Sequence, residues 1–244
     1  MNRKILILGH KGMLGHMVLN HMETSGYEVE TTHLRWPSVE FKKFISEGKW
    51  DFIVNCIGAI HQKTQNFDVN WELPIFLEFF SKSKIIHPGT DCESDQTNYG
   101  RSKKLARDFI VASSKNTKSL KTSIIGPEVA SNSSLMSWFL SHRDSETVRG
   151  FSKQMWNGNT TLTWSQFCCQ IIDEWEKFNT ETILYSECIS KKEILECLNE
   201  VFGRSIRIQD YPDVQLNKCL NGDIKTPHIK EQLVSLRNFY YDKN

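Results

Sequence analysis

The 244-residue chain lacks a long apolar segment. No apolar run approaches the ~20 residues that a membrane-spanning helix needs. The first residues lead from Arg3 and Lys4 directly into a short apolar stretch, without the longer apolar segment and cleavage site of a signal peptide. We therefore expect a cytoplasmic protein with no membrane partner.

An excess of either charge is also lacking. The chain has 30 basic and 29 acidic residues, for a formal net charge of +1, and no basic block stands apart from neighbouring acids. Proteins that bind nucleic acid through its phosphates carry such a block, so we expect no nucleic-acid partner. With 39% hydrophobic and 24% charged residues, the composition is typical of a soluble globular protein with one domain and a smaller lobe.

Patterns of disulfide scaffolds and metal sites are missing as well. The chain has seven cysteines, an odd number, and no Cys-x-x-Cys motif, which predicts reduced thiols. Its eight histidines form no pair at the spacing of a helical metal site, since His16 and His21 are five residues apart. We therefore expect no metal centre. No internal repeat or low-complexity segment is evident either.

Three glycines at regular spacing follow the first apolar stretch. Residues 5–8 are Ile-Leu-Ile-Leu, and Gly9, Gly12 and Gly15 come directly after them. In a strand-turn-helix unit, the first glycine makes the sharp exit from the strand and the second lets the backbone approach a pyrophosphate. The third lets the helix pack closely on the sheet, and the N–H groups that open this helix face the anion. The motif predicts dinucleotide binding.

Strands and helices alternate along the first half of the chain. We expect strands at 5–8, 27–34, 51–58, 84–87 and 119–125, and helices at 13–22, 41–46, 71–80 and 99–113. This order predicts an α/β fold with a Rossmann-like, doubly wound parallel sheet. Beyond residue 127 the pattern changes to longer helices, over 135–142, 164–178 and 190–202. We predict a dinucleotide-binding domain over 1–127 and a smaller, mainly helical substrate lobe over 128–244, part of which can return to the sheet.

Tyr99 and Lys103 are four residues apart, which places both on one face of a helix. Such a pair also arises by chance on a surface, so its position after the 84–87 strand carries the argument. A free tyrosine has a pKa of about 10, and an adjacent cation lowers it. We expect Lys103 to act in this way and to hold the nicotinamide ribose. Tyr99 would then protonate a carbonyl oxygen during hydride transfer while Thr90 donates a hydrogen bond.

The choice between NADP and NAD depends on the end of the second strand. An acidic residue there binds the ribose 2′-hydroxyl of NAD, and Glu30 is the only carboxylate nearby. Lys11 and Arg35 can instead pair with a 2′-phosphate, although both residues also fit a role as solvated surface cations. The sequence therefore favours NADP, with NAD as the alternative.

Four motifs together resemble the extended short-chain dehydrogenase/reductase superfamily. They are the glycine motif, the segment 55–58 (Asn-Cys-Ile-Gly), the pair Thr90 and Asp91, and the Tyr99 to Lys103 spacing. Within the superfamily, the chain is similar to reductases of nucleotide-activated 4-keto-6-deoxy sugars of the dTDP-4-dehydrorhamnose reductase type. Further matches at 122–126, 155–162 and 189–191 extend the resemblance over nearly the whole chain.

The resemblance implies roles for particular residues. Gly12, Met13 and Leu14 would lie against the pyrophosphate, and Gly58, Ala59 and Ile60 near the adenosine or ribose. The full set of expected cofactor-binding residues is Gly9, Lys11, Gly12, Met13, Leu14, Gly15, Arg35, Cys56, Ile57, Gly58, Ala59, Ile60, Tyr99, Lys103 and Ile125. The expected catalytic residues are Thr90, Tyr99 and Lys103, and the expected substrate-binding residues are Thr90, Asp91, Trp156 and Asn157.

Two of the substrate-binding assignments have structural alternatives. Trp156 can instead fill the core of the lobe, and Asp91 can instead cap a turn. The nucleotide sugar would sit between the two lobes. A homodimer is a further expectation, because Phe239, Tyr240 and Tyr241 can mark an interface, although they can equally cover the core.

The chain also departs from the family pattern. The loop after Thr90 and Asp91 is shortened to residues 92–98. The residue before Thr90 is a serine in the family, whereas it is Gly89 here, preceded by Pro88. Two alternatives therefore stay open. One is an epimerase or dehydratase, for which Asp91 and Glu93 are a candidate acid/base pair, although Glu93 is more simply a solvated carboxylate. The other is a non-catalytic dinucleotide-binding protein.

Overall fold

The computed structural model describes residues 3–241 and divides into two compact units. Unit 1 contains the chain up to Lys121 together with Ser165–Thr182, and unit 2 contains Thr122–Trp164 together with the chain from Ile183 on. The segment Ser165–Thr182 thus belongs with the amino-terminal half. The functional division after residue 127 stays a prediction, and the first crossing between the compact units falls six residues before it.

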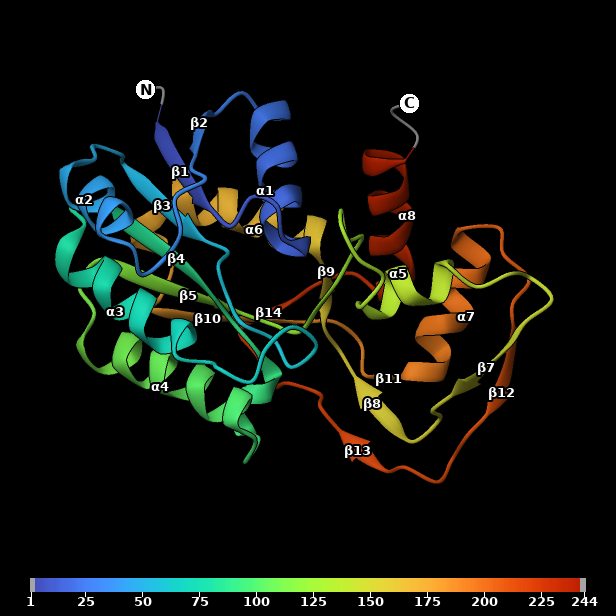
Figure 1. Cartoon of the computed structure of the whole chain (residues 1–244). Coiled ribbons are helices and arrows are strands. Elements are labelled where there is room, and N and C mark those ends of the chain that lie inside the picture. The colour runs from blue at the N-terminus through green and yellow to red at the C-terminus, as the bar shows by residue number, and fades with distance from the viewer. Residues whose placement is uncertain (1–2, 242–244) are drawn as a thin grey trace. The chain divides into compact units, whose positions relative to one another are not determined.

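Unit 1 is built from alternating strands and helices, labelled in Figure 1. They are β1 (Lys4–Leu8), α1 (Met13–Thr24), β2 (Glu28–Thr31), α2 (Val39–Glu47), β3 (Phe52–Asn55), α3 (Val69–Phe80), β4 (Lys84–Gly89), the 3-10 turn η1 (Asp91–Ser94), α4 (Asn98–Ser113) and β5 (Thr117–Lys121). The returning segment adds most of α6 (Thr161–Asp173) and the 3-10 turn η2 (Trp175–Lys177).

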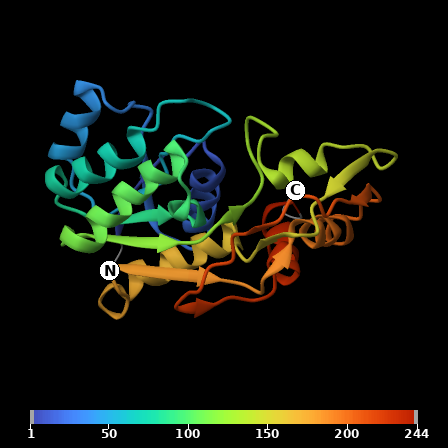
Figure 2. The same cartoon turned by 90° about the horizontal axis from the view of Figure 1, so that it is seen from below.

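A parallel sheet of seven strands forms the centre of the fold, in the order β14-β10-β5-β4-β3-β1-β2. Leu6 pairs with Glu30 of β2 and with Ile53 of β3, so β1 lies between its two neighbours. The helices α2, α3 and α4 cover one face of the sheet and α6 the other (Figure 2). The predicted α/β fold with a Rossmann-like parallel sheet is confirmed.

The main core cluster of unit 1 lies between the sheet and the two helices α2 and α3. Its buried members come from alternating positions of the strands and from one face of each helix, as their periodicities require. They are Leu6, Leu8, Phe41, Ile45, Trp50, Ile53, Leu73, Leu77 and Ile85. Because the strands are buried on both faces, the turns at their carboxyl ends are the natural place for a ligand site.

Unit 2 contains short strands as well as helices. Its elements are β6 (Ile124–Ile125), α5 (Leu135–Leu140), β7 (Thr147–Gly150), β8 (Gln154–Trp156), β9 (Asn159–Thr160), β11 (Ile189–Ser190), α7 (Lys191–Val201), β12 (Arg207–Asp210), β13 (Leu216–Asn217), β14 (Ile224–Lys225) and α8 (Ile229–Tyr240). The strand β10 (Glu181–Tyr185) contains the unit boundary. The strands from residue 147 on were not predicted from the sequence, because strands this short have little periodicity. The helix α8 was also missed, although it is 12 residues long.

The single strand predicted at 119–125 is wrong. The chain forms β5, leaves the sheet at Thr122, and then forms β6, which pairs with β9 in unit 2. Asn159 causes this break, because its Nδ2 donates to Thr122 Oγ1 at 2.8 Å and its backbone N–H donates to Ser123 O at 2.8 Å. An apolar run does not reveal such a distant partner.

The expectation that all cysteines are reduced is also wrong. Cys188 and Cys219 form a disulfide with a Cα–Cα distance of 5.9 Å, across a sequence separation of 31 residues. Cys188 precedes β11 and Cys219 follows β13, and these two strands flank β8 in one small sheet. The pairing therefore arises from sheet order rather than from a local motif.

Residues 3–241 contain neither a helix that could span a membrane nor a group of side chains that could hold a metal ion. No helix there has the length and apolar character that crossing a membrane requires. No group of three or more His, Cys, Asp or Glu side chains in that range is arranged to hold a metal ion.

Candidate active site

The glycine turn after β1 is determined by steric contacts of the backbone. Gly9 has a φ of +77°, and a Cβ there would lie 2.8 Å from the carbonyl carbon of Cys56. A Cβ on Gly15 would lie only 2.2 Å from Gly9 O, which is shorter than any real contact. Both positions therefore require glycine, one for its conformation and both for close packing of the backbone. The motif indicated this arrangement correctly.

The amino end of α1 fits an anion. Gly12 is its N-cap and has no side chain that could cap the first N–H groups by a hydrogen bond. The first turn also has no acidic residue, and Lys11, which is exposed, precedes it. A Cβ on Gly12 would meet only Gly9 O, at 3.4 Å, so the side facing away from the protein is open. The first N–H groups of α1 are thus available to a phosphate, as a dinucleotide requires.

The loop after β3 is tied to α4 by Asn70. Ala59 N–H donates to Asn70 Oδ1 at 2.7 Å, and Asn70 Nδ2 donates to Ala59 O at 3.1 Å and to Ser102 Oγ at 3.0 Å. Ser102 Oγ in turn donates to Tyr99 O at 2.7 Å. The predicted cofactor-binding residues Gly58 and Ala59 are therefore held in a defined position relative to Tyr99. The roles of Asn70 and Ser102 could not be predicted, because neither residue is part of a motif.

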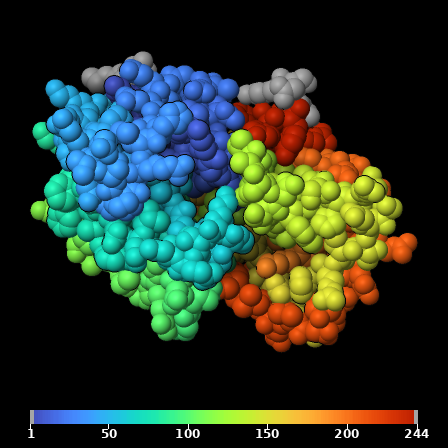
Figure 3. Space-filling model, in the orientation of Figure 1, coloured from blue at the N-terminus to red at the C-terminus, as the bar shows by residue number. Residues whose placement is uncertain are grey.

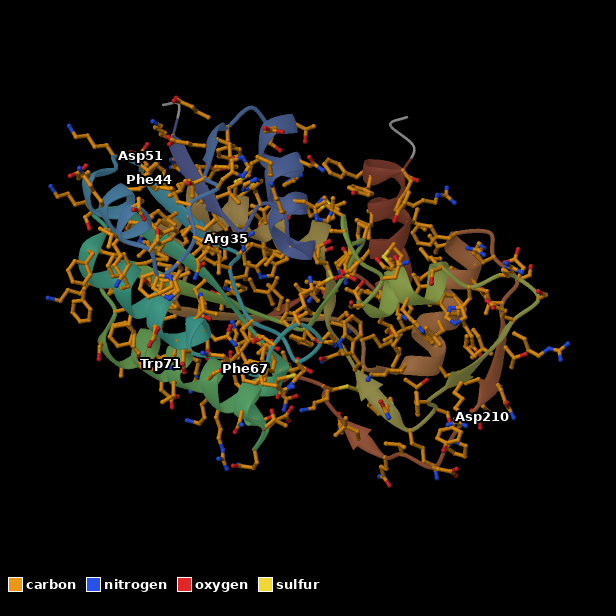
Figure 4. All side chains as sticks on the ribbon, in the orientation of Figure 1. Arg35, Phe44, Asp51, Phe67, Trp71 and Asp210 are labelled. Atoms are coloured by element: carbon orange, nitrogen blue, oxygen red, sulfur yellow. A yellow bond between two sulfur atoms is a disulfide. The ribbon has the colours of Figure 1, made fainter. Side chains whose placement is uncertain are left out.

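More of this loop lies at the surface of unit 1, in the cyan part of Figure 3. His61 is exposed, whereas Phe67, labelled in Figure 4, is buried. Both rings contact the ring of Tyr99, at centroid distances of 5.1 Å for His61 and 5.9 Å for Phe67. Cys56, at the start of the loop, is half-buried, and burial raises the pKa of its thiol. The loop therefore fixes the orientation of the Tyr99 ring.

Thr90 and Tyr99 lie together at the carboxyl end of β4. Thr90 directly follows the strand, and Tyr99 is in the first turn of α4. The two side chains are close enough for Thr90 to act on the pKa of Tyr99. Thr90 Oγ1 donates to Asp91 Oδ1 at 3.0 Å and accepts from Cys92 N–H at 3.3 Å. The structure thus brings the predicted residues Thr90, Asp91 and Tyr99 together at this strand end.

The pKa of Tyr99 is raised, whereas the sequence analysis expected Lys103 to lower it. Burial is the main cause, and the nearby Cys92, Asp91 and Glu93 add to it, while Thr90 acts in the opposite direction. Lys103 does not produce the expected effect, because its Nζ donates instead to Pro88 O at 2.8 Å. Tyr99 is therefore a protonated phenol at neutral pH.

Lys103 is buried, with 8% of its surface exposed. Its Nζ lies 3.4 Å from Nε2 of His87, and Nδ1 of His87 lies 3.2 Å from Nδ2 of Asn55. Burial lowers the pKa of Lys103 to about 8, although Glu93 and a nearby thiol favour its charged form. His87 was missed by the sequence analysis. The available signal was a histidine that follows two buried isoleucines in a strand.

The shortened loop after Thr90 is closed by a buried ion pair. Glu93 Oε1 accepts from Thr90 N at 2.9 Å, and Lys121 Nζ lies 2.6 Å from Glu93 Oε2. The two side chains are only 4% and 13% exposed. A Cβ on Gly89 would lie 2.8 Å from Lys121 Cβ, which explains why this position has no side chain. The reading of Glu93 as a solvated carboxylate is wrong, because the carboxylate is needed to anchor η1 to β5.

The end of β2 lacks an available carboxylate. Glu30 accepts from Trp50 Nε1 at 2.9 Å and pairs with Lys4 Nζ at 3.1 Å, and these contacts lower its pKa, the Trp50 hydrogen bond most. The rings of His10 and His33, which follow β1 and β2, are 5.1 Å apart. Burial lowers the pKa of His10, and His33 and Lys11 contribute to this shift.

Arg35 is exposed on the segment that follows β2 (Figure 4). Together, His10, Lys11, His33 and Arg35 place titratable or cationic nitrogen groups on the segments that follow β1 and β2. The two histidines were not singled out from the sequence. The only signal in the sequence was that each histidine comes shortly after a strand, which places both at the same edge of the sheet.

Three predicted site residues belong to unit 2. Ile125 lies in β6 and is 5% exposed, and Trp156 ends β8 and is also 5% exposed. A Cβ on Gly158 would lie 2.3 Å from the Trp156 ring, so the ring packs directly on the backbone. Asn157 Oδ1 accepts from Leu220 N, and its Nδ2 donates to Leu220 O, both at 2.8 Å. These contacts are structural, and the ligand-binding roles of all three stay predictions.

Comparison with known proteins gives a match in structure only. No family model matches the chain, and no curated protein matches it in sequence. A dTDP-4-dehydrorhamnose reductase from Clostridium acetobutylicum is similar with a TM-score of 0.74 and 18% identity, over 96% of this chain and 98% of that one. A dTDP-4-dehydrorhamnose reductase from Bacillus anthracis, in complex with NADP, gives 0.75 and 11%, over 97% and 99%.

A third similar structure is a dTDP-glucose 4,6-dehydratase from Bacillus anthracis in complex with NAD. Its TM-score is 0.77 at 13% identity, over 99% of this chain and 97% of that one. All three matches span nearly the full length of both proteins. The chain therefore has the fold of the dTDP-4-dehydrorhamnose reductases and of a related dehydratase.

Proposed function

We propose that the chain is an NADP(H)-dependent reductase of a nucleotide-activated 4-keto-6-deoxy sugar, in the synthesis of deoxysugars for surface polysaccharide. One observation carries the proposal: Thr90, which directly follows β4, and Tyr99, in the first turn of α4, lie close together at the edge of the sheet where the glycine turn opens. Similar structures include dTDP-4-dehydrorhamnose reductases, one of them in complex with NADP. An extended short-chain dehydrogenase/reductase activity needs this combination of residues and fold.

Several features support NADP as the cofactor, with NAD as the alternative. The uncapped amino end of α1 suits the pyrophosphate. Because Glu30 is bonded to Trp50 and Lys4, it is not free to accept from a ribose 2′-hydroxyl. Lys11 and Arg35 provide cations for a 2′-phosphate instead. When bound, the reduced cofactor supplies a hydride to the sugar carbonyl.

The residues of the chain then complete the reduction. Tyr99 gives its hydroxyl proton to the carbonyl oxygen, on which negative charge develops. Its raised pKa keeps that proton in place until the oxygen is a stronger base. Thr90 donates a hydrogen bond to the same oxygen in place of its bond to Asp91. Lys103, one helical turn after Tyr99, binds the ribose of the nicotinamide.

The proposal is tested with a panel of 4-keto-6-deoxy nucleotide sugars and stoichiometric NADPH. We expect loss of NADPH absorbance equal to the amount of a sugar alcohol product with at least one member of the panel. Tight NADPH binding without turnover of any member would instead support a non-catalytic dinucleotide-binding protein. Turnover that needs no added NADPH would support an epimerase or dehydratase, because these enzymes regenerate their cofactor.

The dehydratase alternative loses support from the structure. A dehydratase needs an additional acid and base beside the threonine, and Asp91 and Glu93 were the candidate pair. The Glu93 carboxylate is bonded to Thr90 N–H and to Lys121, and is 4% exposed. A group with both oxygens engaged in this way cannot exchange protons with a sugar without breaking the anchor of η1.

A cytoplasmic location and a homodimer complete the proposal. Titration of free thiols under denaturing conditions tests whether the protein comes from a reducing compartment. All seven cysteines would react in a protein from a reducing compartment, and five would react if the Cys188–Cys219 disulfide is intact. Light scattering on the purified chain tests the dimer directly.

A further inference from the structure

His87 is a buried histidine inside the site, and the proposed reaction gives it no role. It lies in β4 and is 2% exposed. Its Nδ1 is 3.2 Å from Asn55 Nδ2 at the end of β3, and its Nε2 is 3.4 Å from Lys103 Nζ in α4. The ring therefore connects the end of one strand to the lysine of the proposed active site.

Asn55 determines which ring nitrogen carries the proton. Its Oδ1 accepts from Ile57 N at 3.2 Å, which directs Nδ2 toward His87. An amide nitrogen only donates, so Nδ1 of His87 accepts and has no proton. The neutral ring then has its proton on Nε2, an assignment that follows from this hydrogen-bond pattern. Burial, and secondarily the charge of Lys103, lower the pKa of His87 and keep the ring neutral.

The Nε2–H group faces Lys103 Nζ, and two donors cannot form a hydrogen bond with each other. The Nε2–H group therefore disfavours a charged Lys103 on the side of His87. The ammonium donates instead to Pro88 O at 2.8 Å. A neutral amine, by contrast, can accept from Nε2–H. The arrangement favours a lysine that gives up a proton more readily than one in water.

The other groups that face Lys103 come from η1 and favour its charge. Cys92 and Glu93 both act in this direction, and Glu93 is itself paired with Lys121 of β5. Burial outweighs them and lowers the pKa of Lys103 to about 8. Tyr99, one turn earlier on α4, is a neutral phenol. The pKa of Lys103 is thus close enough to neutral pH for one additional charge nearby to change the protonation of its amine.

We propose that His87 is a positioning residue that holds Lys103 on the Pro88 carbonyl and couples dinucleotide binding to proton uptake at Lys103. This step rests on the proposed function in one respect, that Lys103 meets the bound dinucleotide. The phosphates of the dinucleotide favour the charged lysine. An ammonium has three hydrogens, and Pro88 O is its acceptor among the described residues, so two remain for ribose hydroxyls.

The direct test is nitrogen NMR of the full chain labelled with ¹⁵N-histidine, without added dinucleotide, from pH 6 to pH 9. The His87 signals are those that disappear in a His87→Val variant. We expect a neutral ring with its proton on Nε2 over the whole range. An imidazolium within this range, or a proton on Nδ1, would overturn the proposal. Because no ligand is present, this result does not depend on the proposed function.

Two substitutions test the coupling through the pH dependence of NADPH binding. In the unmodified chain, the affinity should fall above about pH 8 by up to tenfold per pH unit, as binding requires one proton. His87→Val removes the opposing N–H and should move this midpoint upward by about 0.5 to 1 unit. Asn55→Asp accepts from Nδ1–H, moves the proton to Nδ1, and leaves Nε2 as an acceptor for Lys103. Its shift should be larger.

The double variant separates the tautomer from the added charge of the aspartate. If the tautomer is responsible, Asn55→Asp should shift the midpoint less in the His87→Val background than in the unmodified chain. Equal shifts in the two backgrounds, or an unchanged midpoint in His87→Val, would contradict the proposal. A chain that binds no NADPH at any pH would refute the proposed function, and the NMR result would still decide the tautomer.

Discussion

The glycine turn after β1 and the segment from Thr90 to Lys103 serve the same proposed ligand site but are built differently. The turn is held by contacts between backbone atoms, with Gly9 O at the place where a Cβ on Gly15 would lie. The second segment is held by buried side chains that carry or exchange protons, among them Glu93 with Lys121 and His87 with Lys103. Steric contacts make the glycine turn rigid, whereas the structure of the segment from Thr90 to Lys103 depends on which side chains are protonated.

The difference shows that geometry and electrostatics are separately encoded in this fold. The backbone contacts that hold the glycine turn do not change with pH, although His16 Nδ1 also lies 2.9 Å from Gly12 O. The pairs around Thr90 and Lys103 keep theirs only while the carboxylate is charged and the imidazole is neutral. Substitutions in the two regions should therefore fail in different ways.

The largest effect is expected from Tyr99→Phe, which removes the proton donor and keeps the ring. Turnover should fall by about 10²- to 10⁴-fold, while the dissociation constant of NADPH stays within about twofold. Steady-state kinetics and a fluorescence titration measure the two quantities. Tyr27→Phe is the matched control, because the Tyr27 hydroxyl donates to a side chain outside the proposed site, Asp173, at 2.7 Å. Retained activity in Tyr99→Phe would defeat the assignment.

Breaking the ion pair tests whether the second region depends on charge. Lys121→Met leaves the carboxylate of Glu93 buried without its partner and should lower the free energy of unfolding by about 3 to 5 kcal/mol. Adding Glu93→Gln should restore part of this loss, since a neutral amide can still accept from Thr90 N–H. Denaturant unfolding of the single and double variants measures both. A double variant less stable than Lys121→Met would show that the pair does not act as described.

The glycines test the steric side of the comparison. Gly15→Ala introduces a Cβ 2.2 Å from Gly9 O and should destabilise the fold by about 1 to 3 kcal/mol. Gly12→Ala meets only an ordinary 3.4 Å contact, so stability should change by less than about 0.5 kcal/mol. NADPH binding should nevertheless weaken in Gly12→Ala, because the new methyl group occupies the side facing the pyrophosphate. Thermal unfolding and ligand titration together distinguish the two outcomes.

The smallest effect concerns the choice of cofactor. Replacing both Lys11 and Arg35 with alanine should weaken NADPH binding by about threefold to tenfold and leave NADH binding unchanged, because exposed charges contribute little each. Lys82→Ala, an exposed lysine just before β4, is the control. If the unmodified chain binds NADH more tightly than NADPH, the preference for NADP is wrong.

Much of unit 1 could be predicted from the sequence. The positions of α1, α3 and α4 agree with the structure within two residues at each end. The return of Ser165–Thr182 to unit 1 could not be predicted in detail, since nothing local marks which helix covers which sheet face. The disulfide and the short strands of unit 2 were missed for the same reason. They depend on partners more than 30 residues away in the sequence.

The sequence alone determined the glycine turn and the proximity of Tyr99 to Lys103, because steric limits on the backbone and the helical period act over a few residues. Only the tertiary structure decided what Lys103 contacts and how its proton is held. His87, Glu93 and Pro88 reach this site from another strand end and another turn. Burial and charge at a site are sums over all neighbours in space, and most of those neighbours are distant in the chain.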